Sequence, residues 1–214
     1  MITKTETNCL NMIDCELTYS LASLYISGVQ RLWSEIDRFQ PKHILFLTRS
    51  AVIVQWILEG LVEQLDRDEH NHQNLLKKVQ PISISKKVGT TTQAVASACK
   101  HYHIGRNDPV LVVDEFTEAL PGRRDVDYAA NAIQQAGPTK IRPFVLLDGT
   151  RYRFALQISG LGETRSPILG YCDSITSSAI PQVCHTPREL QPFRSQLINS
   201  YRSLGQRVAE TIKR

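Results

Sequence analysis

Two adjacent carboxylates, Asp114 and Glu115, follow the apolar run of the clearest strand in the sequence, residues 109–113. A Walker B strand also ends in carboxylates, but it needs a Gly-x-x-x-x-Gly-Lys-Ser/Thr loop earlier in the chain. The nearest candidate, Gly89 followed by three threonines, has no lysine and no second glycine, so this interpretation is excluded. A second interpretation stays open, in which the strand simply reaches solvent at two acidic residues.

An Asp-Gly-Thr triplet follows another apolar run, at residues 148–150. The haloacid-dehalogenase phosphatases carry this triplet with a nucleophilic aspartate two residues before it. Leu146 stands at that position here, so the chain has no nucleophile for this chemistry. Asp148 is instead predicted to begin a turn.

His101 and His103 form a further pair with metal-ligating chemistry. Side chains two residues apart on a helix diverge, and no carboxylate partner is evident, so a metal site is disfavoured. The five cysteines are odd in number and irregular in spacing, without a C-x-x-C pair. They indicate neither a disulfide framework nor a zinc ribbon, and they fit a reducing cytoplasm, which is the predicted location.

Composition limits the class of protein. The 214 residues are 42% hydrophobic and 21% charged, as in a globular chain with one well-filled core. No apolar run reaches the roughly 18 residues of a membrane-spanning helix, and the first residues lack the layout of a secretory signal. The net charge of +4 suits a phosphorylated small ligand. Without a dense basic block and interleaved aromatics, nucleic acid is disfavoured as a partner.

The elements that must position these residues alternate between strands and helices. Short apolar runs predict strands, and apolar residues at three- and four-residue steps predict helices. Pro81 places the second strand at a sheet edge. We expect helices over residues 16–39, 51–65, 90–102, 123–136 and 186–213, and strands over residues 43–47, 79–85, 109–114 and 141–147.

This order predicts an α/β fold, a single domain with a parallel sheet of about five strands and helices on both faces. Such sheets bind ligands at the carboxyl ends of their strands, so the loops after Leu47, Ser85, Asp114 and Leu147 form the candidate site. The final helix carries one apolar stripe, which favours packing against its own domain. A homodimer interface is the alternative.

The loop after Asp114 and Glu115 resembles the signature of type I phosphoribosyltransferases. In that family an apolar strand ends in two acidic residues, and a loop rich in Thr and Gly then enters a helix. The resemblance implies that Asp114 and Glu115, as catalytic residues, hold the ribose hydroxyls of phosphoribosyl pyrophosphate. It also implies that the loop binds the 5′-phosphate through backbone N–H groups, as helix N-termini bind anions. The loop residues implied are Thr117, Glu118, Ala119, Gly122 and Arg123.

This loop departs from the family pattern. Residues 116–124 read Phe-Thr-Glu-Ala-Leu-Pro-Gly-Arg-Arg, where the family has a Thr-Gly-Gly-Thr run. Glu118 adds a negative charge near the phosphate, and Pro121 removes one N–H donor. Arg123 or Arg124 offers a guanidinium that fits phosphate.

Two further loops extend the resemblance. Arg49 and Ser50 follow the first strand, where the family places Arg-Gly-Gly, and the resemblance implies that they contact pyrophosphate. Lys86 and Lys87 match the flexible loop that closes over the substrate. The alternatives are a surface arginine that opens a helix and a pair of solvated lysines. The order of the three regions over residues 43–148 agrees with the family core.

The resemblance implies an N-terminal helical flank (1–39), a phosphoribosyltransferase-like core (40–150) and a hood with an amphipathic helix (151–214), with strands expected at 152–158 and 167–171. It implies a transferase of nucleotide metabolism that binds phosphoribosyl pyrophosphate or a nucleotide 5′-phosphate, carries Mg²⁺ on the substrate's pyrophosphate, and moves the phosphoribosyl group to a base. The altered loop leaves a second hypothesis open. The chain then keeps the fold as a binding, regulatory or assembly module without the reaction.

Overall fold

The computed structural model describes residues 19–47, 52–66, 73–84, 90–117, 122–148, 171–172, 184–185 and 194–213. Its centre is a sheet of four parallel strands in the order β2-β1-β3-β4. These strands are β1 (His43–Leu47), β2 (Val79–Ile82), β3 (Pro109–Thr117) and β4 (Lys140–Asp148). A separate antiparallel pair consists of β5 (Tyr171–Cys172) and β6 (Cys184–His185). The predicted α/β class with a parallel sheet is confirmed.

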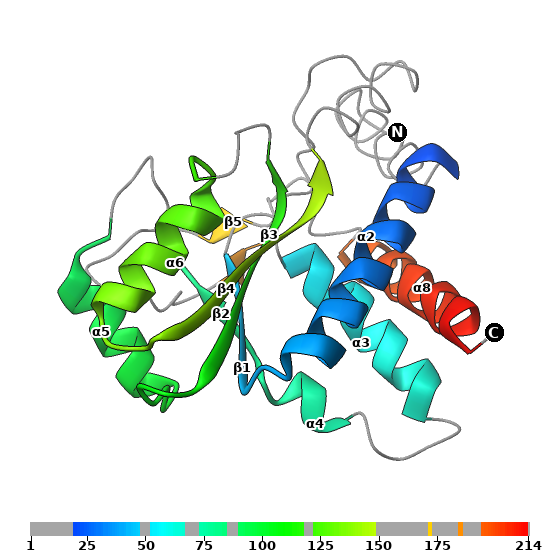
Figure 1. Cartoon of the computed structure of the whole chain (residues 1–214). Helices are drawn as coiled ribbons and strands as arrows, with labels where there is room; N and C mark the ends of the chain where they lie inside the picture. The colour runs from blue at the N-terminus through cyan, green and yellow to red at the C-terminus, as the bar shows by residue number, and fades with distance from the viewer. Residues whose placement is uncertain are drawn as a thin grey trace, which may run out of the picture.

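Helices cover both faces of the sheet (Figure 1). On one face lie α2 (Tyr19–Phe39), α3 (Val52–Asp66) and α8 (Arg194–Ile212), and on the other lie α5 (Thr92–His101) and α6 (Asp125–Gln135). The short α4 (Gln73–Leu76) precedes β2. Within the described residues, no helix combines the length and the apolar character needed to cross a membrane.

Each face of the sheet has its own hydrophobic core. Ile44 and Val113 pack in the core beside α2, α3 and α8, whereas their neighbours Leu45 and Val112 pack in the core beside α5 and α6. Side chains of a strand alternate between faces, so a strand buried on both sides must be apolar at every position. This is why the continuous apolar runs of the sequence become the inner strands.

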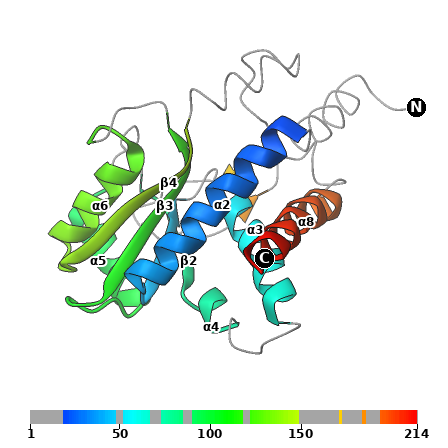
Figure 2. The same ribbon diagram turned by 45° about the vertical axis from the view of Figure 1, so that its right-hand side comes forward.

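Helix α8 packs closely against α3, and the two helices lie side by side in both views (Figures 1 and 2). Gly60 of α3 and Gly205 of α8 stand at the crossing, each in contact with backbone atoms of the other helix. Arg202 of α8 pairs with Glu59 and Glu63 of α3, at 3.0 and 3.2 Å. From Tyr201 to Ala209, the apolar stripe of the final helix is therefore buried against its own domain, in the same layer as α2 and α3.

Several element ends differ from the sequence prediction or lie beyond the described residues. β2 ends at Ile82 and sits at the sheet edge, as Pro81 predicts. Gly137 follows α6 with φ +134°, a conformation that favours glycine and ends the helix. The expected hood strand at 152–158 and the start of the last helix, 186–193, are outside the described part. Of the strand expected at 167–171, only Tyr171 is described, in β5.

Candidate ligand site at the carboxyl edge of the sheet

The predicted acidic pair lies inside β3 and not at its end. Strand pairing continues past both carboxylates, because Thr117 is still the register partner of Asp148 in β4. The expected strand end at Asp114 is therefore wrong. Val112 belongs to the core beside α5 and α6, so Asp114, two residues later, faces that side of the sheet. Glu115 faces the opposite side, toward α2, α3 and α8.

Glu115 is a core residue, with 0% of its surface exposed. The hydroxyl of Tyr25, from α2, donates a hydrogen bond to Glu115 Oε1. Tyr25 is also fully buried, and its ring meets the ring of Tyr201 edge-on with centroids 5.9 Å apart. Burying a polar group costs free energy unless a hydrogen-bond partner compensates. The Tyr25 hydroxyl therefore helps to hold the Glu115 carboxyl inside the core.

Asp114 is also buried, at 8% exposure, but on the other side of the sheet. Its Oδ1 accepts the backbone N–H of Glu115 at 2.9 Å. The pKa of the Arg124 guanidinium is raised above its ordinary value, chiefly by a hydrogen bond to Asp127 and in part by the charge of Asp114. Asp114 is thus the member of the acidic pair that lies beside a cation at the start of α6.

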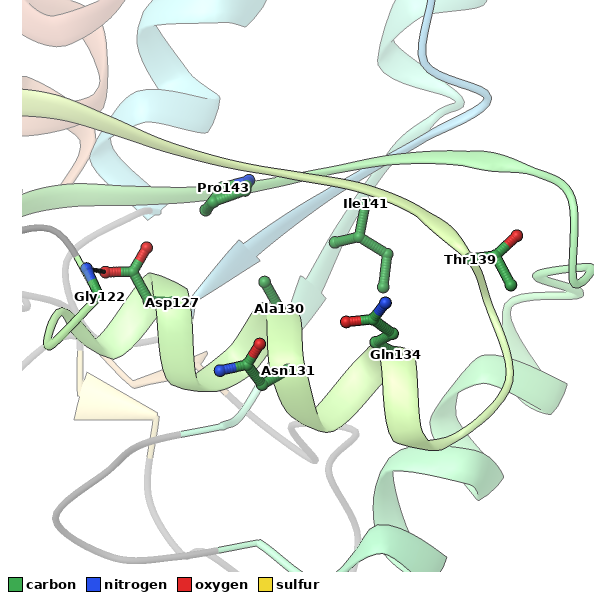
Figure 3. Close-up of a pocket in the computed structure, with 8 residues that line it drawn as sticks. All are labelled: Gly122, Asp127, Ala130, Asn131, Gln134, Thr139, Ile141 and Pro143. Carbon is green, nitrogen blue, oxygen red and sulfur yellow. Dashed lines mark hydrogen bonds between the residues drawn. The ribbon is translucent and has the colours of Figure 1, made fainter.

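The carboxylate of Asp127, inside α6, accepts hydrogen bonds from the residues that begin the helix. Asp127 Oδ2 accepts the N–H of Gly122 at 2.7 Å (Figure 3) and the N–H of Arg124 at 3.1 Å. The Arg124 side chain donates to the same group, Nε to Oδ2 at 2.8 Å and Nη2 to Oδ1 at 2.7 Å. Gly122 has φ +83°, a conformation that favours glycine. Asp127 therefore holds the Gly122 N–H, a donor that the family resemblance assigns to the 5′-phosphate.

Replacement of Asp127 by asparagine is expected to lower the free energy of unfolding by about 1 kcal/mol at neutral pH. Hydrogen bonds from Arg124 hold the pKa of the Asp127 carboxyl below its ordinary value. The carboxylate thus stabilises the fold above the unfolded-state pKa of about 4, and this stabilisation is lost as the pH falls through the lower folded-state pKa. Urea unfolding from neutral to acid pH should show the difference shrinking. A difference independent of pH would contradict the ionic role.

β1 and β3 are neighbours at the centre of the sheet. The chain leaves β1 for β2 on one side and later returns to β3 on the other, so the strand order reverses at this pair. Open parallel sheets bind ligands outside the carboxyl ends of the strands at such a point. One loop follows the carboxyl end of β1 in the sequence, and another follows the carboxyl end of β3. They are the two loops to which the resemblance assigns pyrophosphate and phosphate.

The structure brings part of the predicted site together. Asp114 is on the α6 side of the sheet, Gly122 and the exposed Arg123 precede α6, Thr117 ends β3, and Glu115 is separated from them on the other face. Within this described part, no three or more His, Cys, Asp and Glu residues gather closely enough to hold a metal ion. Outside the described residues lie Arg49, Ser50, Lys86, Lys87, Glu118 and Ala119.

A shallow groove of about 270 Å³ runs between α6 and β4. Figure 3 shows Gly122 and Asp127 at one end of the groove and Gln134 and Thr139 at the other. Thr139 immediately precedes β4, so the groove leads toward the amino ends of the strands. Only its Gly122 end adjoins the candidate site.

Tyr25 and Asp127 contribute to this region although the sequence analysis does not predict them. Tyr25 is 90 positions from Glu115, and no local pattern connects two residues so far apart in the chain. Asp127 does carry a local signal, since it is an acidic residue in the first turn of a predicted helix. Carboxylates at that position commonly accept free backbone N–H groups.

The chain was compared with models of protein families, with curated proteins and with solved structures, and none of these comparisons finds a match. Its function is therefore argued from the residues and the geometry described above.

Proposed function

We propose that the chain is a binding module of the phosphoribosyltransferase type, which holds a phosphorylated small molecule at the carboxyl ends of β1 and β3 without transferring a phosphoribosyl group. The ligand is phosphoribosyl pyrophosphate or a nucleotide 5′-phosphate. The observation that carries the proposal is the position of Glu115, which is fully buried and faces away from Asp114.

Transfer chemistry would need both carboxylates on the ligand. The 2′- and 3′-hydroxyls of a ribose are neighbours, so two carboxylates that hold them must converge on one side of the sheet. The transition state is cationic at the sugar, and carboxylates stabilise it only when they lie close to the developing charge. With Glu115 in the opposite core, only Asp114 can accept a hydrogen bond from the ribose.

Binding itself is supported by charge at the start of α6. Arg123 is exposed there, and a guanidinium fits phosphate oxygens through paired hydrogen bonds. Arg49, in the loop after β1, is the proposed contact to pyrophosphate, and Lys86 and Lys87 belong to the proposed closing loop. In this proposal Mg²⁺ enters on the pyrophosphate oxygens of the ligand, because Mg²⁺ is commonly bound through substrate phosphates.

Calorimetric titration with phosphoribosyl pyrophosphate and with a nucleoside 5′-monophosphate, each with and without Mg²⁺, tests the proposal. Asp114→Asn is expected to weaken binding about tenfold, because it removes a charged acceptor for a ribose hydroxyl. Arg123→Gln should have a similar effect through the phosphate. Arg207→Gln, which removes the same charge from an exposed position of α8, is the matched control and should leave the affinity unchanged.

A turnover assay separates the module from a transferase. The protein is incubated with phosphoribosyl pyrophosphate, Mg²⁺ and a panel of nucleobases, and pyrophosphate release is measured. No release above the protein-free rate is expected. Base-dependent release would make the chain a transferase, whereas a folded protein that gives no heat with either ligand would reject the binding proposal itself.

A further inference from the structure

The antiparallel pair β5–β6 places two cysteines directly opposite each other. Its register pairs Tyr171 with His185 and Cys172 with Cys184. Direct partners across an antiparallel pair lie on the same face. Residues 173–183 separate the two cysteines in sequence, so their spacing alone does not reveal the juxtaposition.

The separation of such partners suits a covalent link. Opposed residues of antiparallel strands have Cα atoms about 4.5 or 5.5 Å apart, depending on the hydrogen-bond pattern. A disulfide accepts Cα separations of about 4.4 to 6.8 Å, so both types of pair fall within the range. Opposed Cβ atoms of antiparallel strands in general lie about 4.5 to 5.5 Å apart, close to the roughly 3.5 to 4.5 Å of a disulfide.

We propose that Cys172 and Cys184 form a reversible cross-strand disulfide, with glutathione disulfide as the oxidant. The thiolate of one cysteine attacks the S–S bond of glutathione disulfide, which gives a mixed disulfide and one glutathione thiolate. The second cysteine, as its thiolate, attacks the mixed disulfide and releases the second glutathione. Two protein thiols become one disulfide while one glutathione disulfide becomes two thiols. The two protons of the protein thiols end on the glutathione thiolates, so electrons and protons balance.

The third cysteine within the described residues does not compete for this reaction. Cys99 is buried on α5, and burial raises the pKa of its thiol, which keeps it protonated and unreactive. The proposed bond instead joins β5 to β6, within residues 151–214 that the sequence analysis assigns to the hood. The inference does not depend on the proposed ligand, because it rests on the register of Cys172 and Cys184 alone.

Redox titration of the full chain tests the proposal. The protein is equilibrated in mixtures of reduced and oxidised glutathione, free thiols are alkylated, and the protein is digested with trypsin. Both cysteines fall in one tryptic peptide, residues 166–188, because no Lys or Arg lies between Arg165 and Arg188. The disulfide form of this peptide escapes alkylation, so it is lighter than the alkylated dithiol form by the mass of two alkyl groups. We expect the folded chain to be half oxidised at a certain ratio of oxidised to reduced glutathione. This ratio should be at least about tenfold lower than the ratio that half-oxidises the chain denatured in guanidinium.

Two variants sharpen the test. Cys9→Ser/Cys15→Ser removes the N-terminal thiols and should leave the ratio for half-oxidation unchanged. Cys184→Ser should abolish the light peptide and leave Cys172 open to alkylation or to glutathione. Equal ratios for the folded and the denatured chain would overturn the proposal. A link from Cys172 to Cys9 or Cys15 in place of Cys184 would also overturn it.

Discussion

Replacing Gly60 or Gly205 by alanine is expected to lower the free energy of unfolding by about 3 kcal/mol or more. A Cβ atom on Gly60 would lie 2.0 Å from the carbonyl oxygen of Arg202, and one on Gly205 would lie 1.9 Å from the carbonyl oxygen of Ile57. Both obstacles are helix backbone, which cannot rotate aside as a side chain can. The helices must separate, which loosens the core that α3 and α8 share around Tyr201.

Guanidinium unfolding followed by circular dichroism measures this loss as a lower midpoint with an unchanged slope. Alanine favours a helix over glycine by up to about 1 kcal/mol, so the measured loss understates the clash. Ser203→Ala, at an exposed position of α8, is the matched control and should change stability by less than about 0.5 kcal/mol. Because Gly60 and Gly205 share one crossing, the double variant should lose less than the sum of the two single variants. Guanidinium unfolding midpoints equal to that of the wild type for both single variants would contradict the close crossing of α3 and α8.

Features with a local physical cause could be predicted from the sequence. The apolar run at residues 43–47 becomes β1 with the same bounds, because a strand covered on both faces must be apolar throughout. Pro81 has no backbone N–H to donate to a neighbouring strand, so it favours an edge position. β2 is accordingly at the edge of the sheet. Gly137 ends α6 because it adopts a positive φ that other residues disfavour. Each of these signals depends on a few neighbouring residues.

Features that depend on distant segments could not be predicted. Charged residues seldom enter a core unless a partner accompanies them, so Asp114 and Glu115 look like the end of a strand. The partner of Glu115 is Tyr25, on a helix that no motif connects to β3. The pairing of Cys172 with Cys184 likewise depends on how two strands meet. The sequence therefore places the acidic pair on the correct strand, whereas the opposite orientations of Asp114 and Glu115 follow only from the structure.

Tyr25→Phe is expected to lower the free energy of unfolding by about 2 kcal/mol. The variant keeps the ring, which packs edge-on against Tyr201, and removes only the hydroxyl that donates to Glu115. The loss exceeds that of an ordinary hydrogen bond because the carboxyl it serves is fully buried. Guanidinium unfolding measures it, and Tyr128→Phe, at a partly exposed position of α6, is the control that should change little. A wild-type midpoint for Tyr25→Phe would contradict the assigned role of the hydroxyl.

A double-mutant cycle isolates the interaction between Tyr25 and Glu115. Glu115→Leu alone removes the acceptor of the hydrogen bond from the Tyr25 hydroxyl, and Tyr25→Phe alone removes that donor from the carboxyl. When both are replaced, neither cost remains, because two apolar groups can replace a buried polar pair with little loss. The double variant should therefore be more stable than the sum of the single losses predicts, by about 1 kcal/mol or more.

The same double variant also bears on function. Glu115 is proposed to stabilise the core and not to touch the ligand, so Tyr25→Phe/Glu115→Leu should bind phosphoribosyl pyrophosphate with the affinity of the wild type. Asp114→Asn should lose affinity while it keeps its stability within about 1 kcal/mol, because asparagine has nearly the same shape and its side-chain oxygen can still accept the N–H of Glu115. If the double variant folds but no longer binds, Glu115 reaches the ligand. The observation that favours a module over a transferase would then be lost.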